Sequence, residues 1–200
     1  MAFPERSRHQ SLRFRIAGFE RVMRRNIVMI GMMGAGKTAI GGELARRLHR
    51  PFVDTDAEIV RAAAMSIPEI FARDGEEFFR ARESEVLGRV LATGNSVVST
   101  GGGAWLRPEN RARIGESGVS VWLDCDLETL WHRVRQRPTR PLLQTADPRG
   151  TLERLLAERR PAYELADIRV FARRGDSIEQ TTNRVIAAID AHDPAILEAE

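Results

Sequence analysis

The part of this chain whose residue types point most directly to chemistry is residues 31–38, which have the sequence GMMGAGKT. This segment matches the phosphate-binding P-loop pattern, G-x-x-x-x-G-K-[ST], at every position. Its glycines let the backbone curl so closely that successive amides can point at phosphate oxygens. Lys37 is then expected to bridge the β- and γ-phosphates of a nucleotide, and Thr38 to hold Mg²⁺. The residues expected to contact the nucleotide are Gly34, Ala35, Gly36, Lys37, Thr38 and Ala39.

Lys37 is also the only lysine of the chain, because all the others of its 31 basic residues are arginine. A lysine ammonium is a compact and mobile charge, whereas an arginine guanidinium is a planar fork. A chain that uses arginine everywhere else but lysine at position 37 indicates that this position requires an ammonium. This favours a nucleotide site over a glycine-rich turn without a ligand.

Two aspartates follow the second predicted strand and are candidates for the metal and acceptor sides of a transfer reaction. Residues 54–56 have the sequence DTD, in which the two carboxylates point in different directions and can serve different partners. One carboxylate can orient the waters of Mg²⁺, and the other can accept a hydroxyl proton or hydrogen-bond a polyol. Asp124 ends a later strand in the same way, but a helix N-cap at Asp124 or Asp126 explains it more simply. We therefore expect Asp54 to be the metal-side carboxylate.

Four further short motifs follow at separate places in the chain. They are F-R-x-x-E at residues 79–83, T-G-G-G at 100–103, R-P-L-L at 140–143 and R-x-P-x-Y at 159–163. Arginine suits a bidentate carboxylate partner, and consecutive glycines let the backbone approach a ligand closely. A proline-bounded lid carrying Arg140 would exclude water and bring positive charge to a transferred phosphoryl group. These groups suit an anionic polyol as the acceptor.

From about residue 26 to residue 190, the order of these motifs resembles that of the shikimate kinase family. The P-loop occurs in many families, but the combined set of motifs is specific. The resemblance implies ATP-dependent phosphorylation of the 3-hydroxyl of shikimate, with Mg²⁺ as cofactor. It also implies a cytoplasmic enzyme, usually a monomer, with a five-stranded parallel sheet like that of the nucleoside monophosphate kinases.

The resemblance further implies roles for single residues. Asp56 would hold the shikimate hydroxyls and act as base or orienting group, while Asp54 would act with Thr38 on the metal side. Arg140 would reach from the lid to the ATP phosphates, so that the catalytic residues would be Lys37, Asp56 and Arg140. The residues expected to bind shikimate are Asp56, Arg80, Gly101, Gly102, Gly103 and Arg159.

Two assignments stay open at this point. The chain is one residue shorter than the family pattern after Tyr163, which leaves Arg160 as an alternative to Arg159, although the spacing to Tyr163 favours Arg159. The sequence also does not select the arginine that stacks on adenine. The candidates for that role are Arg133, Arg135 and Arg137.

The motifs lie between predicted strands and helices that alternate along the chain. Apolar runs predict short buried strands at residues 27–30, 52–54, 97–98, 119–123 and 168–170. One helix is predicted directly after the P-loop and another over residues 57–93, with breaks near Pro68 and Gly75. Further helices are predicted from about residue 126, over 151–164 and over 177–191. An irregular lid is expected at about 137–150. Alternating strands and helices imply right-handed crossovers. We predict one α/β domain with a five-stranded parallel sheet, helices on both faces and a mobile lid.

Composition limits the remaining possibilities. Residues 1–25 contain seven arginines against two glutamates, whereas the whole chain has a net charge of +3, so the remainder is slightly acidic and does not suggest a nucleic-acid partner. We expect residues 1–25 to be a disordered basic extension, 26–192 the folded domain and 193–200 a short tail. No apolar run is long enough for a membrane span. The single cysteine, Cys125, cannot form an internal disulfide, which agrees with a cytoplasmic location.

Three other functions of P-loop proteins fit the motifs less well. A gluconate kinase or a nucleoside monophosphate kinase would keep the P-loop and the lid, but would not require D-T-D, F-R-x-x-E and T-G-G-G together. A GTP-dependent switch protein usually recognises guanine with an N-K-x-D motif, which a chain with Lys37 as its only lysine lacks. A nucleotide-binding regulator without catalysis is not indicated, because Lys37, Asp56 and Arg140 are all present.

Overall fold

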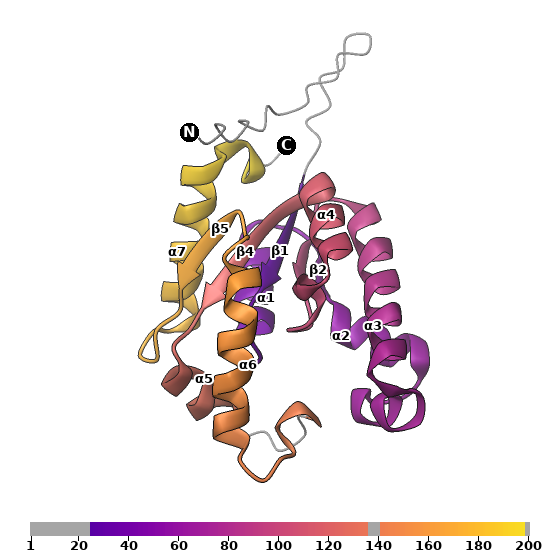
Figure 1. Ribbon diagram of the computed structural model, residues 1–200. Helices are drawn as coiled ribbons and strands as arrows, with labels where there is room; N and C mark the ends of the chain where they lie inside the picture. The colour runs from indigo at the N-terminus through magenta and orange to yellow at the C-terminus, as the bar shows by residue number, and fades with distance from the viewer. Residues whose placement is uncertain (1–24, 136–140, 199–200) are drawn as a thin grey trace, which may run out of the picture.

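A central parallel sheet organises the computed structural model of the protein (Figure 1), which describes residues 25–135 and 141–198. Its strands are β1 (Asn26–Ile30), β2 (Phe52–Asp54), β3 (Val97–Ser99), β4 (Gly118–Asp124) and β5 (Ile168–Phe171). They pair in the order β2-β3-β1-β4-β5, and every pairing is parallel. The prediction of a five-stranded parallel sheet is confirmed.

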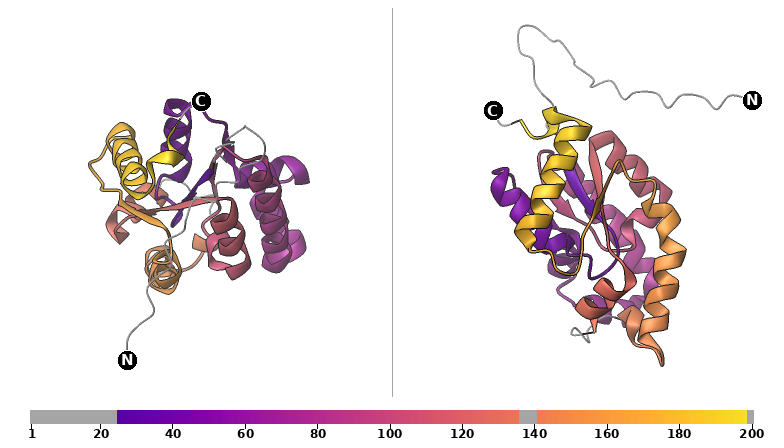
Figure 2. Two further views of the ribbon diagram at one scale, coloured as in Figure 1. Left: turned by 90° about the horizontal axis from the view of Figure 1, so that it is seen from above. Right: turned by 90° about the vertical axis from the view of Figure 1, so that its left-hand side faces the viewer.

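Helices cover both faces of the sheet, as predicted. The longer ones are α1 (Lys37–Arg47), α2 (Thr55–Ala63), α3 (Ile67–Thr93), α4 (Pro108–Ser117), α5 (Leu127–Val134), α6 (Pro148–Tyr163) and α7 (Ile178–His192). Three short 3₁₀ turns are η1 (Ala104–Leu106), η2 (Pro141–Leu143) and η3 (Pro194–Ile196). Figure 2 shows α1 and α7 on one face of the sheet, and α4 and α6 on the other. A parallel sheet requires such coverage, because its strands join through crossover helices.

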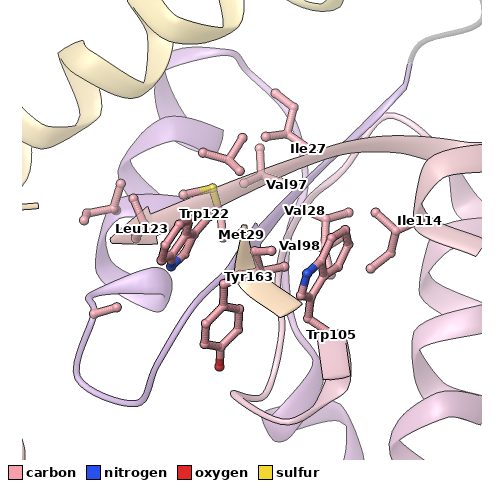
Figure 3. Close-up of a cluster of buried hydrophobic side chains, with 14 of the residues drawn as sticks. Ile27, Val28, Met29, Val97, Val98, Trp105, Ile114, Trp122, Leu123 and Tyr163 are labelled. Atoms are coloured by element: carbon pink, nitrogen blue, oxygen red, sulfur yellow. The ribbon is translucent and has the colours of Figure 1, made fainter. Parts of the chain in front are cut away.

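The strands are apolar because both of their faces are covered. Every residue of β1 and β4 is buried, and their side chains form the centre of the hydrophobic core (Figure 3). Asn26 begins β1 as a buried polar residue whose amide nitrogen donates to Leu91 O at 2.9 Å and to Ser117 O at 3.2 Å. Its amide oxygen accepts from Ser96 N at 3.1 Å. These bonds satisfy the buried side chain and join the start of β1 to the carboxyl ends of α3 and α4 and to the residue before β3.

The helix predicted over residues 57–93 is divided near the two places expected. The main break falls at Ala64, which has a φ of 50°, and α3 then begins with a capping box between Ser66 and Glu69. Pro68 does not break a helix, because it lies in the first turn of α3, where a missing N–H costs nothing. Gly75 does interrupt α3, with a φ of 82°.

Two further differences concern elements whose signals are weak in the sequence. Helix α4 was not predicted, because it has few apolar residues and only Asn110 and Ile114 are buried in it. Helix α6 begins at Pro148, earlier than expected, since the carboxylate of Asp147 caps it by accepting from Gly150 N at 2.9 Å. The first part of the predicted lid, residues 137–140, lies outside the described residues, and residues 141–143 form η2.

Within residues 25–135 and 141–198, none of the helices combines the length and the apolar character that crossing a membrane requires. At the carboxyl end, η3 packs against α7, and Ile196 is buried.

Candidate functional site

The P-loop joins β1 to α1 at the carboxyl end of the sheet. Its three glycines have positive φ angles: 134° at Gly31, 82° at Gly34 and 100° at Gly36, which directly precedes α1. Glycine adopts these angles without the steric penalty of a side chain. At Gly34, a Cβ atom would also lie 2.7 Å from a methyl carbon of Val134. The loop therefore depends on glycine for its path and for its packing against α5.

Lys37 begins α1, and its side chain turns back into the P-loop. Its Nζ donates to Gly31 O at 2.8 Å and to Met32 O at 2.9 Å, and the residue is buried. The ammonium is thus held at the loop that would enclose phosphates. This placement agrees with the role predicted for Lys37 from the sequence.

Thr38 and Asp54 meet at the mouth of the P-loop, as expected for the metal side. The hydroxyl of Thr38 donates to Asp54 Oδ2 at 2.8 Å, and its oxygen lies 3.4 Å from Ser99 Oγ at the end of β3. The other oxygen of Asp54 caps α2, accepting from Asp56 N at 3.0 Å and from Ala57 N at 3.3 Å. A hydroxyl and one carboxylate form the kind of small oxygen donor set that Mg²⁺ uses together with water and phosphate oxygens. Ser99 was not recognised from the sequence, because only the pairing of β2 with β3 brings it here.

Asp124 has a different environment from Asp54. It is almost fully buried, and its carboxylate accepts from Arg160 at 3.2 Å and from Arg169 at 2.6 Å. Asp126 caps α5, with Thr129 N donating to it at 2.7 Å, so the cap interpretation applies to Asp126 and not to Asp124. A surface cavity of about 400 Å³ borders this cluster of ion pairs and is not lined by the P-loop.

Two carboxylates converge on the first glycine of the T-G-G-G segment. A Cβ atom at Gly101 would lie 2.3 Å from Glu83 Oε1 and 2.7 Å from Asp56 Oδ1. Such distances are shorter than any normal contact, so only glycine fits between the two groups. Asp54 and Asp56 therefore face different partners, as the D-T-D spacing predicted.

A direct consequence concerns stability. Replacing Gly101 by alanine is expected to lower the free energy of unfolding by about 1–3 kcal/mol, because the added methyl displaces two buried carboxylates. The matched control is Gly115→Ala in exposed helix α4, where a Cβ atom meets nothing within 4 Å. That change should stabilise the protein by up to about 1 kcal/mol, since alanine has the higher helix propensity. Urea unfolding of both variants measures the difference. A Gly101→Ala variant with the same free energy of unfolding as the parent protein would contradict this packing.

Arg80 lies on α3 beside the same glycines. Its guanidinium donates to Glu83 Oε2 at 3.0 Å and to Glu76 Oε1 at 3.0 Å. A Cβ atom at Gly103 would lie 2.3–2.8 Å from the Arg80 guanidinium. Arg80 is thus an oriented cation at the glycine turn, and not a charge on a solvated helix face.

Glu83 is the residue that holds Arg80 in place. It is fully buried, and its Oε1 has no hydrogen-bond partner among the described residues. Burial raises the pKa of Glu83, and the neighbouring Arg80 opposes that rise. Glu83 is the last residue of the F-R-x-x-E motif, but the sequence alone predicts no role for it, because its burial and orientation depend on how α3 packs against residues 100–103.

The structure distinguishes Arg159 from Arg160. Arg159 is buried, and one nitrogen of its guanidinium lies 3.6 Å from the Cβ position of Gly102. Arg160 instead pairs with Asp124, and its guanidinium lies 5.4 Å from the centre of the Trp122 ring. The geometry agrees with the preference for Arg159 as the acceptor-side cation.

Of the adenine candidates, Arg133 approaches the P-loop most directly. It donates to Gly34 O and to Ala35 O, both at 3.2 Å, and to Arg173 O at 3.4 Å. Arg135 is exposed at the end of α5. Arg137 and Arg140 lie outside the described residues.

Comparisons with known proteins agree with this site. The family model described as shikimate kinase matches residues 33–190. The chain is 58% identical over 174 residues to the shikimate kinase of Ruegeria pomeroyi, covering 87% of this chain and 89% of the relative. It is 54% identical over 178 residues to that of Cereibacter sphaeroides, covering 89% of this chain and 88% of the relative.

Solved structures give the same result. A shikimate kinase from Acinetobacter baumannii in complex with shikimate superimposes with a TM-score of 0.81 at 35% identity, covering 84% of this chain and 94% of that chain. A gluconokinase from Sinorhizobium meliloti has a TM-score of 0.55 at 19% identity, a likeness that extends to the fold alone. With the family model matching most of its length and relatives above 50% identity along most of both chains, a chain with this P-loop and this glycine turn bordered by two arginines belongs to the shikimate kinase family.

Proposed function

We propose that the protein transfers the γ-phosphoryl group of ATP to the 3-hydroxyl of shikimate, giving shikimate 3-phosphate and ADP. The observation that carries this proposal is the convergence of Asp56, Arg80 and Arg159 on the glycine turn 101–103. Gly102 itself packs on the P-loop, since its Cβ position lies 3.6 Å from Gly31 O and from Met33 N. Acceptor-binding groups and phosphate-binding backbone are therefore neighbours.

Arg80 and Arg159 would bind the carboxylate of shikimate. Both guanidiniums border the glycine turn, and a guanidinium can bind a carboxylate through two parallel hydrogen bonds. Because glycines leave the backbone uncovered, Gly101, Gly102 and Gly103 would let the ring approach the turn closely. This arrangement favours an anionic acceptor over an uncharged polyol.

Asp56 would hold the acceptor hydroxyl and accept its proton or orient it for attack. It lies in the first turn of α2, two residues beyond Asp54 at the end of β2. A carboxylate in this position can act on the acceptor while Asp54 acts on the metal side. Positioning of this kind accounts for most of the catalysis in phosphoryl transfer.

Lys37 and the P-loop amides would bind the ATP phosphates, with Arg140 of the lid as the further cation of the proposal. Thr38 and Asp54, with Ser99 beside them, would hold Mg²⁺. Bound Mg²⁺ would supply neutralisation of the charge that develops on the β- and γ-phosphate oxygens. We further propose a monomeric, cytoplasmic enzyme without nucleic-acid or membrane partners, which size determination in solution and cell fractionation would check.

The experiment that tests the function is a coupled ADP-release assay with Mg²⁺-ATP. Shikimate, gluconate and nucleoside monophosphates are compared as acceptors. Turnover with shikimate alone is the expected result. Release of ADP with another acceptor, and none with shikimate, would refute the acceptor assignment while leaving the nucleotide site in place. Repeating the assay after chelation, and with Mg²⁺ restored, tests the metal proposal.

The variant Arg80→Ala tests the carboxylate site. The Kd of shikimate should rise about 30-fold or more, because the acceptor carboxylate would lose a buried charged partner. The matched control is Arg82→Ala, two residues along α3, where the side chain is 52% exposed and pairs with Glu85. Calorimetric titration with shikimate measures both. An unchanged affinity in Arg80→Ala, with Arg82→Ala also normal, would remove Arg80 from the site.

A further inference from the structure

Tyr163, the last residue of α6, carries a hydroxyl although its ring lies in the hydrophobic core. The residue is fully buried, and its ring stacks on that of Trp122 with centroids 5.9 Å apart. Figure 3 shows the Tyr163 ring between the indoles of Trp122 and Trp105. These contacts explain an aromatic ring at this position. They do not explain the hydroxyl, because phenylalanine would fill the same space without burying a polar group.

The hydroxyl of Tyr163 is bonded to the acceptor turn. It donates to Gly102 O at 2.6 Å, and its oxygen lies 3.8 Å from the sulfur of Met32 in the P-loop. Burial raises the pKa of Tyr163 to about 12, so the hydroxyl keeps its proton and remains a donor throughout the neutral range. The bond therefore ties α6 to the second glycine of the turn.

The turn formed by residues 101–104 could adopt two conformations. Ala104 N donates to Gly101 O at 3.2 Å, so Gly102 and Gly103 are the two central residues of a β-turn. Gly103 has φ −96° and ψ −18°, the values of the third residue of a type I turn. A type II turn has a positive φ there, which glycine adopts readily, and the two types differ by a flip of the central peptide. Two glycines at the centre leave the chain itself without a strong preference.

The orientation of that central peptide decides what the turn offers to a ligand. A peptide group is planar and trans, so Gly102 C=O and Gly103 N–H point in opposite directions. Since Gly102 O faces Tyr163 in the core, Gly103 N–H points away from the core. Gly103 N–H donates to no backbone or side-chain acceptor in the described part of the chain, and Gly103 is buried against Arg80. A buried donor of this kind requires a partner.

Arg159 connects the same helix to this turn. It lies four residues before Tyr163 on α6, so both side chains project from one helix face. Arg159 and the hydroxyl of Tyr163 both reach Gly102. The end of α6 thus presents a cation and a neutral donor to the same glycine of the turn.

We propose that Tyr163 is a positioning residue for the acceptor: its hydroxyl selects the type I turn, which directs Gly103 N–H to the carboxylate bound by Arg80 and Arg159. This inference rests on the proposed function, because shikimate supplies the carboxylate. Tyr163 touches neither substrate in this arrangement. Its effect passes through the backbone of residues 102 and 103.

The variant Tyr163→Phe tests the proposal, since it removes the hydroxyl and keeps the ring. The Kd of shikimate should rise about 3- to 10-fold, the effect of one hydrogen bond, with the Kd of ADP unchanged. A second ligand, the shikimate analogue with a hydroxymethyl group in place of the carboxylate, should bind equally weakly to both forms. Loss of the Tyr163 effect with this analogue assigns it to carboxylate recognition and not to general loosening of the fold.

A control removes a comparable bond to the same helix while leaving the bond between Tyr163 and Gly102 in place. Trp105 Nε1 donates to Ala162 O at 2.8 Å, so Trp105→Phe weakens the attachment of α6 next to Tyr163. Thermal unfolding of both variants shows whether they remain folded. The inference is overturned, while the function stands, if Tyr163→Phe binds shikimate with the Kd of the parent protein. It is overturned equally if the Kd values for shikimate and for its analogue rise by the same factor. If the parent protein itself does not bind shikimate, the proposed function fails and the inference fails with it.

Discussion

Replacing Lys37 by alanine should lower kcat/KM for ATP by about 10²–10³-fold, the usual cost of losing one preorganised charge at a reacting group. Lys37 is buried at the P-loop, with its ammonium on Gly31 O and Met32 O. It is also the only lysine of the chain, so no neighbouring ammonium can replace it. Steady-state kinetics with varied ATP, together with titration by ADP, measure the effect on turnover and on binding.

Two further variants make the Lys37 result specific. Lys37→Arg keeps the charge but replaces a mobile ammonium by a planar fork, and it should recover only part of the lost activity. Arg46 lies on the same helix, and its side chain is 70% exposed and paired with Glu43. The variant Arg46→Ala should therefore keep the kcat/KM of the parent protein. Activity of Lys37→Ala within tenfold of the parent would contradict a role for Lys37 in phosphate binding.

Replacing Asp56 by asparagine should lower kcat by about 10²–10⁴-fold, because a general base contributes about that much. Asparagine has nearly the same shape as aspartate, so it can occupy the space beside Gly101 and Glu83. It lacks the negative charge that would accept or orient the proton of the acceptor hydroxyl. The Kd of ATP should change by less than about twofold, since the lost interaction lies on the acceptor side.

Glu58→Gln is the matched control for Asp56. Glu58 also lies in the first turn of α2, but it forms an ion pair with Arg61 and does not approach the glycine turn. Neutralising it should leave kcat unchanged. Single-turnover measurements separate the chemical step from product release in both variants. Near-normal turnover in Asp56→Asn would show that Asp56 is neither the base nor an orienting group.

Much of the fold could be predicted because its signals are local in the sequence. A strand, a glycine-rich turn and a helix are contiguous at residues 26–47, so the pattern of β1, the P-loop and α1 is complete within one short segment. The other buried strands appear as apolar runs for the same reason. Helix α4 was missed because so little of it is buried. The break before α3 was predicted near Pro68 and lies just before it, because proline is compatible with a first helical turn.

Residue types of the site were also predictable, whereas their partners were not. Asp56, Arg80 and a run of glycines could be recognised in the sequence, in motifs that suit an anionic acceptor. That Arg159 faces the turn while Arg160 pairs with Asp124 became apparent only from the folded chain. These two arginines are adjacent in the chain, and the direction of each depends on residues far away in the sequence.

Tyr163 illustrates the same limit most clearly. Its motif was visible in the sequence, but its bond to Gly102 joins residues 61 positions apart. Two central glycines allow either turn type, so no local preference could predict the orientation of their peptide. Local patterns determine which elements form, since backbone preference and burial periodicity act over a few residues. The long-range packing of α3 and α6 against the turn decides where each functional group points, because only the folded chain brings those partners together.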